Sequence, residues 1–262
     1  MSDPTSPSTS TSTSSTGPEA VASPSGAADS RLDRWLAMLD LPVLRDDKPR
    51  VGVSACLLGR LVRYNGEAKR HGTVADVLPR WLQFTEYCPE VAIGLPVPRP
   101  PVDIIATETG QQIRNRDGLV ADITDALHAC ADDVCQQNAR TDKTPPPDGM
   151  ILKARSPSCG PGNTPLLNTN GQQIGITHGG FAARLKTHCP DMPMVHEEQL
   201  VRAVDIEVFV LRVFLYREQR RWGNDGKNVA WCRDMRARIM TLPSTDIRAR
   251  LLQQLEKQVT KK

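Results

Sequence analysis

The chain has 262 residues, a net charge of only +3 and seven cysteines, and 39% of its residues are apolar. An odd number of cysteines argues against a complete disulfide framework and favours thiols, metal ligands or catalytic groups in a reducing compartment. No apolar run is long enough for a secretory signal or a membrane span, so we expect a cytoplasmic protein with no membrane contact.

The first segment of the chain, residues 1–28, consists mainly of Ser, Thr, Pro, Gly and Ala. It has too little apolar surface to offset the entropy of ordering, so the sequence predicts a disordered extension. Residues 29–48 are expected to form a short docking helix and a linker, since Asp29 or Ser30 precedes four apolar residues at helical spacing. These four residues are Leu32, Trp35, Leu36 and Leu39.

Residues 49–200 have the pattern of one α/β domain. Strands are predicted at residues 50–54, 81–87 and 149–153, and each runs into a loop that carries a cysteine. A helix is predicted at 122–140. Alternating strands and helices indicate a parallel sheet, whose ligand sites lie beyond the carboxyl ends of the strands. The three cysteines at these ends are Cys56, Cys88 and Cys159.

The segments after the third strand are shorter. A hairpin is predicted at residues 168–175, a helix at 181–187 and a last strand at 192–196. The run of prolines at 95–101 must be extended, because each proline disfavours helix at the preceding residue, and it would suit the wall of a cleft.

Residues 201–262 are predicted to form a basic helical extension. This region holds fourteen Lys or Arg against seven Asp or Glu, a local charge of +7 that leaves −4 for the rest of the chain. Its apolar stripe must pack on the domain or on a second subunit, so a dimer is one expected outcome. Six arginines are expected to stay mostly exposed, either as a solvated face or as contacts to tRNA phosphates: Arg217, Arg220, Arg221, Arg233, Arg236 and Arg238.

The three cysteines at strand ends suit an iron-sulfur cluster. Three thiolates from separate loops can hold a 4Fe-4S cluster and leave one iron without a protein ligand. Such an iron is a soft Lewis acid that prefers sulfur to oxygen, which suggests a thiocarbonyl substrate. Their spacing matches no compact cluster motif, so small buried thiols are an equally supported interpretation. The other four cysteines are interpreted as packing residues or as lacking metal-like neighbours: Cys130, Cys135, Cys189 and Cys232.

The sequence words around the three cysteines resemble a known family. They are Ser54-Ala-Cys-Leu-Leu-Gly59 with Val62-Arg-Tyr-Asn-Gly66 and Lys69, Cys88-Pro-Glu-Val91 with Gly94-Leu-Pro-Val-Pro-Arg-Pro-Pro101, and Leu152-Lys153 with Ser156-Pro-Ser-Cys-Gly160. In this order, from about Val51 to Leu200, they resemble the bacterial thiouracil desulfidase family, long catalogued as a domain of unknown function.

The resemblance implies a Rossmann-like α/β domain with a 4Fe-4S cluster on Cys56, Cys88 and Cys159. It also implies an enzyme that removes sulfur from 2- or 4-thiouracil, or from 4-thiouridine free or in tRNA, to give the carbonyl product and hydrogen sulfide. No nicotinamide or flavin is expected, because the reaction moves no net electrons and the sequence has no dinucleotide fingerprint. The competing hypothesis is a non-catalytic iron-sulfur or zinc module that senses redox state or binds thiolated RNA.

Several residues near the cysteines are candidates for the chemistry. Glu90 is the first choice for proton transfer and Glu86 the second, and the alternative role for Glu90 is to orient its own loop through backbone hydrogen bonds. Ser156 and Ser158 are candidates for orienting substrate or bonding the cluster, with simple turn formation as the alternative. The basic candidates for substrate contacts are Arg63, Lys69, Arg99 and Lys153, although exposed salt bridges are the commoner fate of such residues.

Overall fold

The computed structural model describes residues 25–41, 43–135, 145–222 and 226–259. Two four-stranded sheets and seven α-helices are joined by short turns within these ranges. The strands are β1 Arg50–Ser54, β2 Gln83–Tyr87, β3 Asp103–Thr107, β4 Gly110–Arg114, β5 Gly149–Leu152, β6 Thr164–Leu167, β7 Gln173–Thr177 and β8 Met194–His196. The helices are α1 Ser25–Met38, α2 Pro89–Ala92, α3 Thr124–Cys135, α4 Gly180–His188, α5 Ala203–Trp222, α6 Gly226–Thr241 and α7 Thr245–Val259.

The first sheet is parallel throughout, in the order β2-β1-β5-β8. Successive side chains of β5 point to opposite faces, so Met150 and Leu152 pack with α3 and α4 while Ile151 joins the core under α5. Because both faces are covered, β1 and β5 are built from nearly uninterrupted buried residues. The predicted α/β class with a parallel sheet is confirmed.

The second sheet, in the order β4-β3-β6-β7, is mixed. The β3–β4 and β6–β7 pairs are antiparallel hairpins, and β3 runs parallel to β6. The predicted hairpin corresponds to β6–β7, whereas β3 and β4 were not predicted from the sequence. Ile104 and Ile113 pack against Leu127 of α3, so this sheet is fastened to the helical layer of the first.

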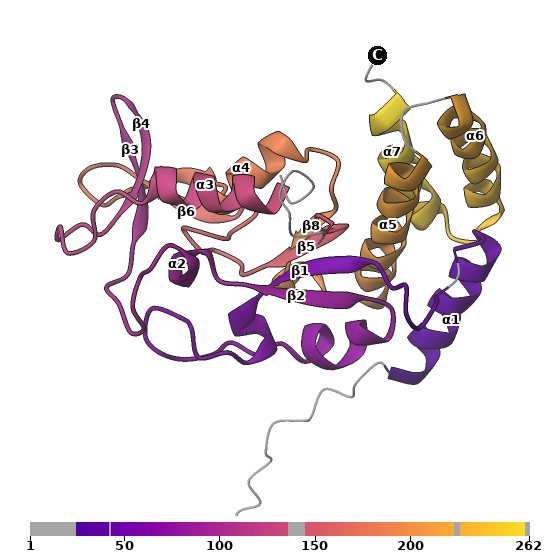
Figure 1. The fold of residues 1–262 in the computed structure, drawn as a ribbon, viewed down its shortest axis with the longest axis horizontal. Coiled ribbons are helices and arrows are strands. Elements are labelled where there is room, and N and C mark those ends of the chain that lie inside the picture. Colours follow the sequence, from indigo (N-terminus) through magenta and orange to yellow (C-terminus); the bar gives the residue numbers. More distant parts are fainter. Residues whose placement is uncertain (1–24, 42, 136–144, 223–225, 260–262) are drawn as a thin grey trace, which may run out of the picture.

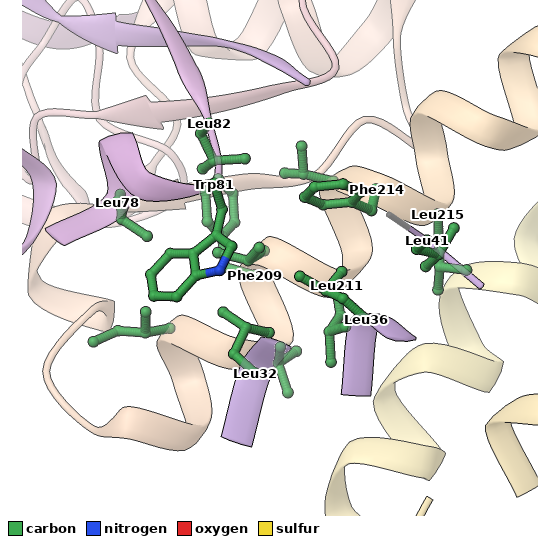
Figure 2. Close-up of a cluster of buried hydrophobic side chains, with 14 of the residues drawn as sticks. Leu32, Leu36, Leu41, Leu78, Trp81, Leu82, Phe209, Leu211, Phe214 and Leu215 are labelled. Carbon is green, nitrogen blue, oxygen red and sulfur yellow. The ribbon is translucent and has the colours of Figure 1, made fainter. Parts of the chain in front are cut away.

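Helices α1, α5, α6 and α7 gather at one end of the molecule, and the second sheet lies at the other (Figure 1). Figure 2 shows Trp81 in the same buried cluster as Leu32 and Leu36 of α1 and Phe209 of α5. Helix α5 packs against α1, α6 and α7, which buries Val208, Leu211 and Leu215 of the predicted apolar stripe within the chain, while Val201, which precedes the helix, is exposed.

Two boundaries differ from the sequence prediction. Helix α1 begins at Ser25, so the last four residues of the predicted disordered segment are helical, and residues 1–24 lie outside the described residues. The helix predicted at 122–140 is α3 at Thr124–Cys135, and residues 136–140 of that prediction also lie outside the described residues. No helix in the described part of the chain is long and apolar enough to cross a membrane.

The prediction that the six arginines stay mostly exposed is wrong for Arg217. This side chain is buried and donates to the Asp47 carbonyl oxygen at 2.5 Å. Arg220 is also turned inward, where it donates to Asp148 at 3.1 Å. Both residues lie on α5, whose packed face extends further along the helix than the aliphatic stripe indicated.

Candidate active site

Three cysteines meet at the carboxyl edge of the parallel sheet. Cys56 lies in the turn after β1, Cys88 directly follows β2, and Cys159 lies in the loop after β5. Ser54 and Tyr87, the last residues of β1 and β2, are register partners, so their loops leave the sheet side by side. All three cysteines line one cavity of about 470 Å³.

The backbone around these cysteines is tightly constrained. The turn that holds Cys56 ends at Gly59, whose φ of 98° is a left-handed conformation that glycine adopts without strain. In the third loop, a Cβ on Gly160 would meet Thr164 Oγ1 at 2.0 Å, so only glycine fits there. The first turn of α4 fastens the same loop, because the Phe181 amide donates to the Ser158 carbonyl oxygen at 3.0 Å.

The three thiols influence one another. Burial, with a smaller contribution from Cys88, raises the pKa of Cys56 to about 11. Burial and the charges of Glu90, Cys56 and Cys88 raise the pKa of Cys159 well above its ordinary value. Burial also raises the pKa of Cys88. These raised pKa values favour the neutral thiols despite the neighbouring Lys153, Arg63 and Arg99, and a cationic metal centre is the kind of group that converts such thiols to thiolates.

The donor set fits a cluster. Within the described ranges, no group of three or more His, Cys, Asp or Glu side chains converges as the ligands of a single metal ion do. In a 4Fe-4S cluster each thiolate binds a different iron, so its ligands surround the cluster from separate directions. Three thiols spaced around a cavity of this size suit that arrangement.

Glu90 is held in the cavity wall by two donors. Arg99 Nε donates to Glu90 Oε2 at 2.6 Å, and Ser158 Oγ donates to Glu90 Oε1 at 2.8 Å. The side chains of Glu90 and Arg99 are only 14% and 3% exposed. The other guanidinium nitrogens of Arg99 donate to the carbonyl oxygens of Pro96 and Val62 at 3.2 and 3.0 Å. All three guanidinium nitrogens of Arg99 are therefore hydrogen-bonded, and one of them, Nε, positions Glu90.

A second ion pair lies on the β5 side of the cavity. Lys153 Nζ lies 2.5 Å from Glu197 Oε1, and the Ala154 amide donates to Glu197 Oε2 at 2.7 Å. The Lys153 amide donates to Ser54 Oγ at 2.9 Å, which ties β5 to β1 just before their cysteine loops. The buried Glu197 thus fixes the backbone that leads to Cys159.

The structure brings most of the predicted site residues together. Besides the cysteines and Glu90, the cavity lining includes Arg63, Lys69, Arg99, Lys153 and Ser156. Ser158 is fully buried behind Glu90. Glu86 is not among the lining residues and pairs with Arg60 at 2.7 Å on the surface.

Sequence reasoning missed four residues of the site. Tyr64, Tyr87 and Asp103 line the cavity, and Glu197 supports it from the segment after β8. Tyr64 lies within the sequence words that carried the family resemblance, and Tyr87 immediately precedes Cys88, so proximity to those words was an available signal. Glu197 had no local signal, because its partner Lys153 is 44 residues away in the chain.

More than half of the chain matches a known protein family. The family model for 2-thiouracil desulfurase matches residues 51–197. A solved structure of a 4Fe-4S-dependent thiouracil desulfidase, TudS, is 32% identical, with a TM-score of 0.44, over 58% of this chain and 93% of that one. No curated protein matches the chain.

Proposed function

The chain belongs to the 2-thiouracil desulfurase family, and from this premise we propose that it is a 4Fe-4S-dependent desulfidase of thiolated pyrimidines. The observation that carries the proposal is the convergence of Cys56, Cys88 and Cys159 on one cavity from three adjacent parallel strands. The net reaction exchanges sulfur for oxygen: thiocarbonyl and water give carbonyl and hydrogen sulfide, with no net electron transfer.

The three cysteines would hold the cluster as thiolates. A cluster with only three protein ligands supplies an iron that acts as a soft Lewis acid towards a thiocarbonyl sulfur. The protein contributes the enclosure, since Gly59 and Gly160 let the loops approach closely and the ion pair between Lys153 and Glu197 anchors the third loop.

Glu90, rather than Glu86, is proposed to move the protons. Each carboxylate oxygen of Glu90 has a second acceptor position beyond its bond to Arg99 or Ser158, so Oε1 is able to take a proton from an attacking water. The same oxygen would return the proton to the departing sulfur. Arg99 and Ser158 are assigned to positioning, because they hold the carboxylate in one orientation.

Substrate contacts are proposed for cavity-lining residues that neither hold the cluster nor move protons. Lys153 Nζ donates to Glu197 and to the Ala154 carbonyl oxygen, which leaves one of its three hydrogens for a pyrimidine oxygen. Arg63, Lys69 and Ser156 line the same cavity and are further candidates. Tyr64 and Tyr87 offer flat apolar faces to a planar ring.

A free base or nucleoside is proposed as the substrate in preference to tRNA. Among the arginines of the helical extension, Arg221 pairs with Asp47, Arg236 with Glu256 and Arg238 with Asp234. Carboxylates therefore already neutralise part of the basic surface that would contact phosphates. A cytoplasmic location is proposed as well, since the seven cysteines are free thiols, as a reducing compartment would keep them.

Anaerobic cluster reconstitution tests the function. The reconstituted protein would be incubated separately with 2-thiouracil, 4-thiouracil, 4-thiouridine and thiolated tRNA. The carbonyl product and sulfide would be measured in each case. We expect equal amounts of both products from a free base or nucleoside. A protein with four irons that releases sulfide from none of these would favour the redox-sensing or RNA-binding alternative, and zinc in place of iron would refute the cluster.

Replacing Arg220, Arg221, Arg236 and Arg238 by Ala tests the choice of substrate. We expect turnover of 4-thiouracil to be retained and tRNA to remain a poor substrate. Selective loss of activity on thiolated tRNA, with a weaker salt dependence of binding, would show that these arginines contact phosphates.

A further inference from the structure

Two cysteines outside the active site lie in direct contact. Cys135 is the last residue of α3, and Cys189 directly follows α4. Their Sγ atoms are 3.2 Å apart, although the residues are 54 positions apart in the chain. The sequence alone indicates a packing residue at Cys135 and no metal-like neighbour at Cys189, whereas the structure brings the two thiols together as a pair.

The two helices are braced so that the thiols stay together. Arg184 of α4 makes a bidentate ion pair with Asp132 of α3, at 2.7 and 2.9 Å. His188 Nε2 lies 3.0 Å from the same carboxylate. Asp132 is one turn before Cys135 and His188 is adjacent to Cys189, so this brace sets the distance between the two sulfur atoms.

The pair opens into a cavity of its own. A hollow of about 180 Å³ is lined by both cysteines and by Tyr216, Arg220 and Pro146. None of these residues lines the active-site cavity. Both cysteines are only partly buried, so small reagents can reach the sulfur atoms.

The surroundings give the two thiols different properties. The hydrogen bond between the two sulfur atoms, aided by the positive charge of Arg220, lowers the pKa of Cys189 despite partial burial. The same hydrogen bond and burial raise the pKa of Cys135. Arg220 is held beside the pair by Asp148 and by the carbonyl oxygens of Pro146 and Pro147. The thiol with the lowered pKa is suited to attack a disulfide first, and its neighbour is suited to be the resolving thiol, which attacks the mixed disulfide that results.

We propose that Cys135 and Cys189 are a redox-active dithiol, which a low-molecular-weight disulfide of the glutathione type oxidises to an intramolecular disulfide. The Cys189 thiolate attacks one sulfur of that disulfide, forms a mixed disulfide and releases one thiolate. Cys135 then loses its proton to that thiolate and attacks Cys189 Sγ, which releases the second thiolate. Two protein thiols are oxidised and one small disulfide is reduced to two thiols, so atoms and electrons balance.

The position of the pair connects it to the rest of the molecule. The disulfide would close a loop that contains β5 and Cys159, and α4, whose first turn fastens the Cys159 loop, ends beside Cys189. A disulfide stabilises mainly by restricting the unfolded chain, so the oxidised protein is expected to melt at a higher temperature than the reduced one.

Peptide mapping tests the proposal on the full chain with its cluster reconstituted. The protein would be equilibrated anaerobically in glutathione buffers from fully reduced to mainly oxidised, quenched in acid, alkylated and digested. We expect the peptides with Cys135 and Cys189 to be joined in the oxidised buffer and separate in the reduced one. Separate, alkylated peptides under both conditions would overturn the proposal.

Single variants identify the two roles. Cys135→Ser should trap one glutathione on Cys189, because the resolving thiol is gone, while Cys189→Ser should leave Cys135 largely unmodified. The matched control is Cys130→Ser on the same helix, which should form the disulfide normally. In the Cys135→Ser variant, equal glutathione labelling of Cys130 and Cys189 would refute a special reactivity of the pair. The readout is a covalent bond and not turnover, so the dithiol proposal is tested independently of the desulfidase reaction.

Discussion

Replacement of Glu90 by Gln separates proton transfer from structural support. The carboxylate accepts from Arg99 Nε at 2.6 Å and from Ser158 Oγ at 2.8 Å, one donor on each oxygen. An amide offers only one acceptor oxygen, so its NH₂ group must face one of the two donors. The variant thus loses one hydrogen bond and the charge that pairs with Arg99.

The structure supplies the magnitudes. Breaking a buried ion pair costs about 3–5 kcal/mol, and the lower end applies because Arg99 keeps its two carbonyl acceptors. Loss of a general acid or base lowers turnover by about 100-fold, which corresponds to about 2.7 kcal/mol in the activation barrier. We therefore expect a lower melting temperature, a retained cluster and turnover per cluster reduced by about two orders of magnitude.

The assay is the rate of sulfide release from 4-thiouracil divided by the iron content of each sample. The matched control is Glu86→Gln, which breaks a solvent-exposed and therefore weak pair with Arg60. It should leave turnover unchanged. Full turnover per cluster in Glu90→Gln would refute the proton-transfer role, and loss of the cluster would show that Glu90 serves the loop of Cys88 instead.

Two further predictions concern the cluster and the core. Serine in place of any one of Cys56, Cys88 and Cys159 should abolish desulfidase activity and most iron binding, because a hydroxyl is a poor ligand for iron in a cluster. The control Cys232→Ala should keep a normal iron content. Equal loss of iron from the control and the ligand variants would overturn the ligand assignment. Leu36→Ala should lower the free energy of unfolding by about 2–5 kcal/mol, since Leu36 is fully buried under α5. The control is Met38→Ala, at a side chain that is 42% exposed, which should lower the free energy of unfolding by under about 0.5 kcal/mol. Both values are measured by denaturant titration, and similar losses of stability in the two variants would contradict the docked position of α1.

Much of the fold was predictable because its signals are local. Strands β1 and β5 are short apolar runs, and each leads into a cysteine loop that contains glycine, which is typical of a buried parallel strand before a ligand loop. The hairpin β3–β4 was missed because its strands are only five residues long and show no apolar/polar alternation: β3 has two adjacent isoleucines and β4 has two adjacent glutamines. Proline and charged residues surround it and make such short strands hard to recognise.

The pairing of side chains was not predictable in the same way. Arg99 had the appearance of a substrate contact, yet all its guanidinium nitrogens are bonded inside the protein. Arg217 appeared to be a surface residue of a basic helix and is buried. In both cases the partner of a charged residue is set by how distant segments pack, and charge patterns along one segment carry no information about it.

The sequence by itself determined the order of strands and cysteine loops, and with it the edge of the sheet at which Cys56, Cys88 and Cys159 meet. It did so because parallel neighbouring strands necessarily end at the same edge. Only the tertiary structure decided that Glu90 rather than Glu86 faces the cavity, and that Cys135 touches Cys189. These outcomes depend on the direction of a side chain and on the packing of two helices, which arise from contacts between residues far apart in the chain.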